Sequence, residues 1–233
     1  MATSGSYNWS ATRADIISGA LRKIGALGDW ETASNEKITA GAAALQPLIK
    51  AWQADGMPVW AIKEQVIGST NLASGAVNIG LGQTVNIAKP LKVTQAMLRR
   101  GDIDSPLDIW DRHNYNTLVN HAITGTPTIV YYQPLLDYGV LKCYPRPDAA
   151  TQAATSVVIT YQAMFEDMDS DSNDLSLPPE WTEAVIYGLA VRLAPEYGLS
   201  INERQQLKME AKEAKDLALS FGTEEGSLYI QPG

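Results

Sequence analysis

Apolar side chains recur at helical spacing in the first part of the chain, and polar residues mark the points where helices begin. Thr12 is a favourable N-cap, and Asp15 stands three residues later as its capping-box partner. The apolar series that follows is Ile17, Ala20, Leu21 and Ile24. A second helix is expected to begin near Ser34 or Asn35. Its apolar side chains follow at steps of four, three, four and three: Ile38, Ala42, Leu45, Ile49 and Trp52. The two patterns predict a helical hairpin over residues 12–58.

From Val59 onward the pattern changes to short runs that are rich in β-branched residues and are separated by Gly, Ser, Asn and Pro. Such runs predict short strands, roughly six or seven of them, which is typical of a small barrel or sandwich. The runs are residues 59–67, 76–81, 84–88, 91–98 and 156–165, together with two strands within 127–145 around a turn at 135–139. Residues 111–122 are expected to form one short helix or an irregular excursion.

Two further helices are predicted after this region. Pro178 and Pro179 suit the start of a helix, because the N–H that proline lacks would be unpaired at that position. The helix over residues 181–198 is apolar on nearly every side, so we expect it to be buried at the centre of the fold. Ser200 and Glu203 form a capping box for the last helix. One face of that helix carries Leu207, Ala211, Ala214, Ala218 and Phe221.

Neither helical end of the chain can bury its apolar face alone. We therefore predict an α+β fold, in which the N- and C-terminal helices form one helical bundle and a central β-rich domain, sandwich or barrel-like, is inserted between them. The expected boundaries are 1–11 for an N-terminal arm, 12–58 for the hairpin, 59–177 for the β-rich insert, 178–221 for the C-terminal helix pair and 222–233 for an extended tail.

The chain has a net charge of −8, and the excess of acidic residues is local. Eight acidic residues and no Lys or Arg lie between Arg146 and Arg192, while the rest of the chain holds 18 acids and 18 bases. No basic stripe is present that could neutralise several phosphates, which argues against stable binding of DNA or RNA. DNA could therefore pass near this protein without being held by it.

Composition and hydropathy point to a globular chain. Hydrophobic residues make up 45% and charged residues 19% of the sequence, which is ordinary for a globular protein. No apolar stretch approaches the roughly 18–20 residues that span a bilayer. The first residues, MATSGSYNWSATRADI, lack the basic start and apolar core of a secretory signal. We expect a cytoplasmic origin and no insertion into a membrane.

Few residues suggest chemistry. Cys143 is the single cysteine, which excludes an intramolecular disulfide and a multi-cysteine zinc site, and we interpret it as a small, semi-buried residue. His113 and His121 have no Glu between them at metalloprotease spacing, so we expect surface or hydrogen-bonding histidines. Ser34 and Lys37 make an S-x-x-K motif without its companion motifs, and a helix start explains Ser34.

The acidic loop before the C-terminal helices is the best metal candidate in the sequence. Asp169, Asp171, Asn173 and Glu180 fall at positions one, three, five and twelve of an EF-hand-like spacing. Position six is Asp174 instead of glycine, and the preceding element is a predicted strand. We therefore favour a solvated acidic loop that caps a helix. No carboxylate lies in an apolar context that would raise its pKa, and we predict no catalytic residue, no bound metal and no cofactor.

Two segments of the chain resemble a known family. The stretch TRADIISGALRKIGALGDWETASNEKITAGAAALQPLIKAWQADGMPVWAI is similar to the N-terminal helical hairpin of phage head-to-tail adaptor proteins, a group that includes the tail tubular protein A and the packaged-DNA stabilisation proteins of short-tailed phages. The shared features are an alanine-rich hairpin with an acidic/Asn turn, a W-x-x-x-G-M-P-x-W exit and a strand after Trp60. The closing LPPEWTEAVIYGLAVRLAPEYG with its charged helix is similar to the C-terminal pair of the family.

The resemblance implies a non-enzymatic structural protein of the virion, in the tail or neck, assembled in the host cytoplasm. It implies a ring, twelve-fold in the family, that docks beneath the portal protein and is extended by the tail nozzle protein. Such a ring continues the DNA channel, helps retain the packaged DNA and, in some members, holds tail fibres. DNA would pass through the channel without specific binding.

The expected partner-binding residues lie at the two chain ends. We expect Leu228, Tyr229 and Ile230 in the tail to bind a neighbouring subunit or the portal, and Tyr7 and Trp9 in the arm to dock similarly. Two other functions stay open: a carboxylate-dependent, cell-wall-degrading enzyme of the virion, and a carbohydrate-binding β module.

Overall fold

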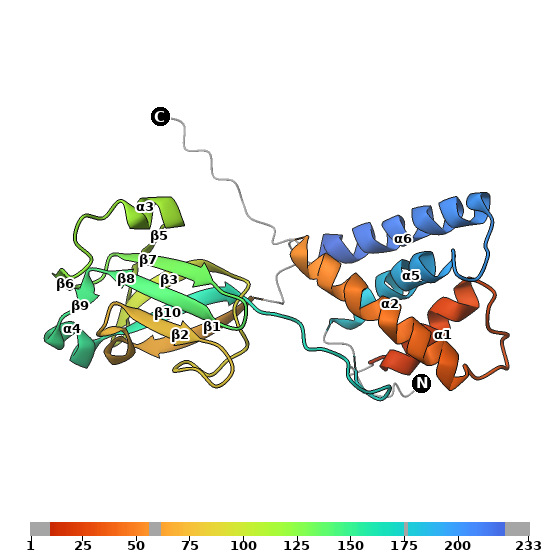
Figure 1. Ribbon diagram of the computed structural model, residues 1–233, viewed down its shortest axis with the longest axis horizontal. Helices are drawn as coiled ribbons and strands as arrows, with labels where there is room; N and C mark the ends of the chain where they lie inside the picture. Colours follow the sequence, from red (N-terminus) through yellow and green to blue (C-terminus); the bar gives the residue numbers. More distant parts are fainter. Residues whose placement is uncertain (1–9, 56–61, 175–176, 222–233) are drawn as a thin grey trace, which may run out of the picture. The chain divides into compact units, whose positions relative to one another are not determined.

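The computed structural model describes residues 10–55, 62–174 and 177–221 (Figure 1). The chain divides into two compact units. We call the described part of residues 1–59 and 165–233 the helical unit, and the described part of residues 60–164 the β unit. The helical unit is therefore built from both ends of the sequence, and the β unit from one continuous stretch between them.

The predicted fold class is wrong, because helices are spread along the chain and do not form a terminal bundle. The described residues contain six α-helices and ten strands in three sheets, which makes the fold a mixed α/β one. Two short helices, α3 (Arg112–Asn116) and α4 (Ala149–Ala154), lie between strands in the middle of the sequence. Each begins at an aspartate N-cap, Asp111 or Asp148, whose carboxylate accepts a hydrogen bond from a backbone N–H in the first turn. Helix α3 lies within residues 111–122, where a short helix was one of the two expected structures, whereas no helix was predicted at α4.

The helical unit contains four longer helices and one short 3-10 turn. Their bounds are α1 Arg13–Lys23, α2 Asn35–Ala54, α5 Thr182–Leu193, α6 Ile201–Phe221 and η3 Pro179–Trp181. Helix α5 contacts each of the other three. Among the described residues, no helix combines the length and the apolar character that a membrane span requires.

The helix starts agree with the capping signals of the sequence. The Thr12 hydroxyl accepts a hydrogen bond from the Asp15 N–H over 3.2 Å, and the Asp15 carboxylate accepts one from the Thr12 N–H over 3.1 Å. Ser200 and Glu203 form the same reciprocal pair, over 3.3 Å and 2.8 Å. Ser34 caps α2. All three predicted starts are confirmed, because each depends only on residues within one turn.

The core of the helical unit surrounds α5. Trp181, which is 1% exposed, meets Trp52 of α2 edge to face, with ring centroids 5.9 Å apart and an interplanar angle of 65°. A Cβ on Gly188 of α5 would lie 3.0 Å from the Trp52 ring, so the glycine lets α5 approach α2 closely. Val185 and Leu189 have no exposed surface. The prediction of a buried helix at this position is confirmed.

The β unit contains two four-stranded sheets and one two-stranded sheet. The first has the order β1 (Ile62–Gly68), β10 (Ser156–Gln162), β3 (Lys92–Arg100) and β4 (Ile103–Pro106), all antiparallel. The second has the order β2 (Ala76–Ile79), β8 (Gly139–Tyr144), β7 (Ile129–Pro134) and β5 (Asp108–Ile109), of which β5 and β7 are parallel. The third pairs β6 (Thr124–Gly125) with β9 (Arg146–Pro147). A short 3-10 turn, η2 (Ser69–Leu72), follows β1.

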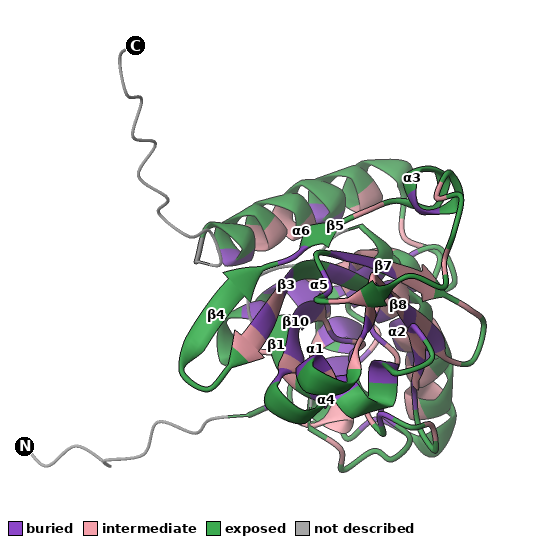
Figure 2. Cartoon of the chain, turned by 90° about the vertical axis from the view of Figure 1, so that its left-hand side faces the viewer, coloured by how far each residue is buried: buried purple, intermediate pink, exposed green. Residues whose placement is uncertain are grey.

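One apolar cluster contains buried residues from both four-stranded sheets, including Ile67, Val157, Val130 and Leu141. Figure 2 shows this burial on β10 and β3. The predicted strand pair around residues 135–139 is confirmed as β7 and β8. Residues 84–88, in contrast, form only an isolated bridge between Val85 and Ile79, so the strand predicted there is wrong.

Replacement of Trp181 by alanine should strongly destabilise the helical unit. Trp181 is buried, and a Trp→Ala change in a core costs about 3–5 kcal/mol through lost contacts and the cavity left behind. Trp30 is the matched control, because it lies in the same unit and is 100% exposed. We expect Trp181→Ala to lower the urea midpoint of the far-UV circular dichroism transition and Trp30→Ala to leave it unchanged. Equal midpoints for the two variants would contradict the burial described here.

Candidate functional site

The partner-binding residues expected from the sequence cannot be placed in the fold. Tyr7 and Trp9 in the arm, and Leu228, Tyr229 and Ile230 in the tail, lie outside the described residues. Their role in docking stays a prediction.

The acidic segment after β10 is tied to the start of α1. The side chain of Arg13, 14% exposed, donates a hydrogen bond of 2.5 Å to the Met168 carbonyl and forms an ion pair with Asp171. Backbone hydrogen bonds run in parallel, from the Arg13 N–H to the Asn173 carbonyl and from the Ala14 N–H to the Asp171 carbonyl. The carboxylate that would be a metal ligand in the EF-hand-like pattern is thus partnered by a guanidinium.

Helix α2 holds the same segment from a second side. The Lys50 ammonium lies 2.6 Å from the Asp167 carboxylate and donates to the Phe165 carbonyl over 3.3 Å. Among the described residues, which include all four positions of the EF-hand-like pattern, no group of three or more His, Cys, Asp or Glu side chains is arranged to hold a metal ion. The acidic segment of residues 165–174 is thus held by side chains of both α1 and α2.

Cys143 and Ser34 have structural roles. Cys143 lies on β8 with its side chain in the apolar cluster, and burial raises the pKa of its thiol to about 12. The residue is therefore fully buried and not semi-buried as expected. The Ser34 hydroxyl accepts from the Lys37 N–H, while the Lys37 ammonium donates to the Ala26 carbonyl over 2.8 Å. The S-x-x-K motif thus serves to begin α2.

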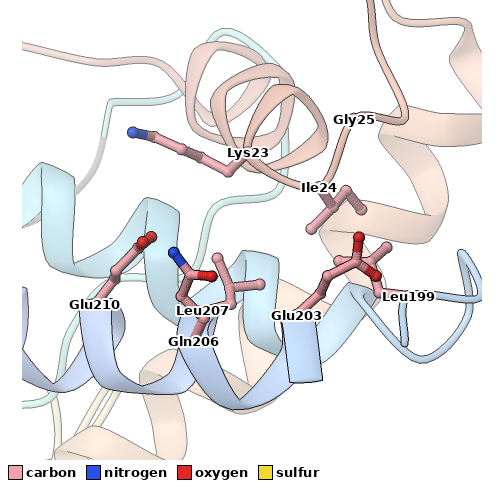
Figure 3. Close-up of a pocket in the computed structure, with 8 residues that line it drawn as sticks. All are labelled: Lys23, Ile24, Gly25, Leu199, Glu203, Gln206, Leu207 and Glu210. Atoms are coloured by element: carbon pink, nitrogen blue, oxygen red, sulfur yellow. The ribbon is translucent and has the colours of Figure 1, made fainter. Parts of the chain in front are cut away.

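A groove of about 360 Å³ opens within the helical unit, between the end of α1 and the start of α6 (Figure 3). Its lining residues are Lys23, Ile24, Gly25, Leu199, Glu203, Gln206, Leu207 and Glu210. In Figure 3 the side chains of Gln206 and Glu210 point from α6 toward the end of α1 that carries Lys23. Ile24 and Leu207 are buried at its base.

The charged groups of the groove are already engaged. The Lys23 ammonium donates to the Tyr187 hydroxyl over 2.8 Å and lies 4.3 Å from the centre of the Tyr187 ring. This hydrogen bond, with the nearby Glu183 and Glu210 carboxylates, raises the pKa of Lys23. Hydrogen bonds with Ser200 lower the pKa of Glu203. A lysine fixed as a cation and a carboxylate used as a cap suit the docking of a polypeptide better than acid–base catalysis.

The outer face of α6 carries apolar side chains among charged ones. Ile201, Met209 and Leu217 are each at least 60% exposed, whereas Leu207 and Ala218 on the opposite face are buried. Figure 2 shows the exposed character of most of this helix. Apolar side chains that lie singly among charged ones are common on protein surfaces, so substitution of one of them is the test of whether this face contacts another protein.

The groove was not found from the sequence. Lys23 and Glu210 are brought together by packing of α1 and α6, and no local spacing signals a relation between residues so far apart. A comparison with models of protein families finds no match for this chain, and a comparison with curated proteins finds none either. The likeness to adaptor proteins therefore stays a prediction from the two segments of the sequence that carry it.

The thiol of Cys143 should be unreactive in the folded chain. With a pKa of about 12, its thiolate fraction at pH 8 is about a thousandfold below that of a thiol with the ordinary pKa of 9.0. We expect Ellman's reagent at pH 8 to leave the native protein unlabelled for hours and to react with one thiol per chain within minutes in 8 M urea. Rapid labelling of the native chain would show that β8 does not bury this residue.

Proposed function

We propose that this chain is a structural head-to-tail adaptor of a tailed phage. It forms a ring beneath the portal, continues the DNA channel, helps retain the packaged DNA and provides the docking platform for the tail nozzle. The observation that carries the proposal is that the two segments similar to adaptor proteins, 129 positions apart at Trp52 and Trp181, share one core. A chance likeness of two separate segments would not require them to pack together.

The contact between the two segments is extensive. Beyond the pair of tryptophans, a Cβ on Gly19 of α1 would lie 3.1 Å from Ile186 of α5, and a Cβ on Gly188 of α5 would lie 3.2 Å from Leu48 of α2. Small residues thus lie where the helices of the two segments approach one another. This packing supports the proposal that the two segments belong to one structural unit.

Charge distribution supports passage of DNA without retention on the protein. Residues 1–59 and 165–233 hold ten basic and nineteen acidic residues, a net charge of −9, while residues 60–164 hold eight and seven, a net charge of +1. Stable DNA binding requires several Lys or Arg side chains against phosphates. A protein surface with an excess of acidic side chains repels the phosphate backbone and keeps a moving duplex from adhering.

The described carboxyl groups give no support to an enzymatic alternative. Hydrogen bonds lower the pKa of each of the three carboxyls whose pKa departs clearly from its ordinary value: Asp104, Asp148 and Glu203. A carboxylic acid that acts as general acid near neutral pH needs its pKa raised. The shifts therefore favour structural carboxylates.

Assembly with the portal is the direct test. We expect the purified chain to form rings in negative-stain images when the portal protein of the same virus is added. Met209→Glu should reduce ring formation at least tenfold, because Met209 is 65% exposed on α6 and a carboxylate there would be desolvated in a subunit contact. Ala40→Glu adds one negative charge at an exposed position of α2, another helix of the same unit, and should assemble normally. Failure of the unmodified chain to bind the portal would reject the proposal.

The tail has its own test. Removal of residues 223–233 takes away Leu228, Tyr229 and Ile230, the expected docking residues, and should abolish co-purification with the portal. Replacement of these three by serine, with the length of the tail kept, should have the same effect. Co-purification that survives both changes would show that the tail does not dock, and would leave the adaptor role to the helical unit.

A further inference from the structure

The β unit contains a second concave site, which the adaptor role does not use. It is a pocket of about 240 Å³ between the turn before β2, helix α3 and the strands β8 and β9. Its lining residues are Ser74, Gly75, Ala76, Tyr115, Asn116, His121, Lys142 and Arg146. Two of these residues, Lys142 and Arg146, are basic and one is a histidine, and no carboxylate lines the pocket.

Aromatic rings hold Lys142 in position. Tyr115, 7% exposed, lies between His121 and Tyr131, with ring centroids 5.1 Å and 5.2 Å away. The Lys142 ammonium is 5.7 Å from the centroids of both tyrosine rings. The ion pairs found among the described residues include neither Lys142 nor Arg146. The positive charge is thus oriented by ring faces and is not neutralised by a carboxylate.

A glycine makes room for Arg146. Gly75 has a φ of +86°, and a Cβ there would lie 2.9 Å from both Cγ and Nε of Arg146. The Gly75 carbonyl accepts from the Cys143 N–H over 3.0 Å, and the Arg146 N–H donates to the Ile123 carbonyl over 2.9 Å. The backbone on both sides is therefore fixed, and the arginine side chain runs along the glycine into the pocket wall.

His121 contributes a polar atom that has no partner. Its Nδ1 has less than 1 Å² of exposed surface and makes no hydrogen bond with any described residue. Buried nitrogen atoms of this kind are normally satisfied, by protein, water or ligand. The lining has two basic side chains and no carboxylate, so it lacks a negatively charged hydrogen-bond acceptor.

We propose that this pocket binds one oxyanion, a carboxylate or a phosphate group. The Arg146 guanidinium offers a fork of N–H donors that matches two oxygens, and the Lys142 ammonium adds a point charge. The volume admits one acidic group with a few attached atoms. The same chemistry can come from a free small anion or from an acidic side chain of a second copy of this chain, whose residues 165–174 hold five acids.

The test is a titration of the full-length chain with inorganic phosphate, followed by NMR of the labelled arginine and histidine side chains. We expect saturable shifts at Arg146 and His121. Arg146→Gln and Lys142→Gln should each weaken binding by about tenfold or more, the loss of one charge-assisted contact. Lys63→Gln, an equal change of charge at an exposed position of β1, should bind as the unmodified chain does. Gly75→Ala should also weaken binding, because its Cβ displaces Arg146.

Two controls keep the result decisive. Protection of the Cys143 thiol shows that the β unit of each variant is folded, so that lost binding is assigned to the pocket. A peptide of residues 165–174 is titrated in parallel. If the peptide binds at least tenfold more tightly than phosphate, the occupant is an acidic side chain of a second copy. If it does not, the occupant is a free small anion. Absence of shifts with both probes, or equal affinity of Arg146→Gln and the unmodified chain, would overturn the proposal.

Discussion

The edge-to-face contact of Trp52 and Trp181 is the constraint on which the helical unit depends. It joins α2 to the beginning of α5, and the whole β unit lies between these two helices in the sequence. Bringing them together closes a long loop, and burial of large apolar side chains offsets the entropy lost in that closure. Gly188 and Gly41 then set how closely the helices approach. In the same packed unit, Arg13 and Lys50 form ion pairs with the acidic segment of residues 165–174, and α5 contacts its three neighbouring helices. The groove beside α6 is a consequence of the same packing.

In the β unit, successive side chains of β8 alternate between the apolar cluster and the pocket. Leu141 and Cys143 point into the apolar cluster, while Lys142 between them lies at the oxyanion pocket. A strand has a period of two, so this division follows from its geometry. The turn at Gly75 adds the other requirement, because only a residue without a Cβ leaves the space that Arg146 occupies. Both cations of the pocket are thus placed by backbone geometry that the core itself enforces.

How much the sequence reveals depends on the range of the interactions involved. Capping boxes at Thr12 and Ser200, and the strand pair around residues 135–139, are local and were predicted. The fold class was not, because helices are spread along the chain and α4 begins at a single aspartate cap where no helix was predicted. Strands of two residues such as β5 and β6 carry no periodicity at all. The groove and the pocket escaped prediction because packing, and not spacing, brings their residues together. The expected docking residues at the chain ends stay untested by the fold.

The burial of the single cysteine also has a practical consequence. Since Cys143 is the only thiol of the chain and burial raises its pKa to about 12, we expect the native protein not to react with maleimides at neutral pH. A cysteine introduced at an exposed site, such as the position of Trp30, would then be the sole reactive handle without removal of the natural residue. Dyes, spin labels or gold clusters could be attached there one per subunit. In any closed assembly, the number of labels counted on one particle would report its rotational symmetry directly.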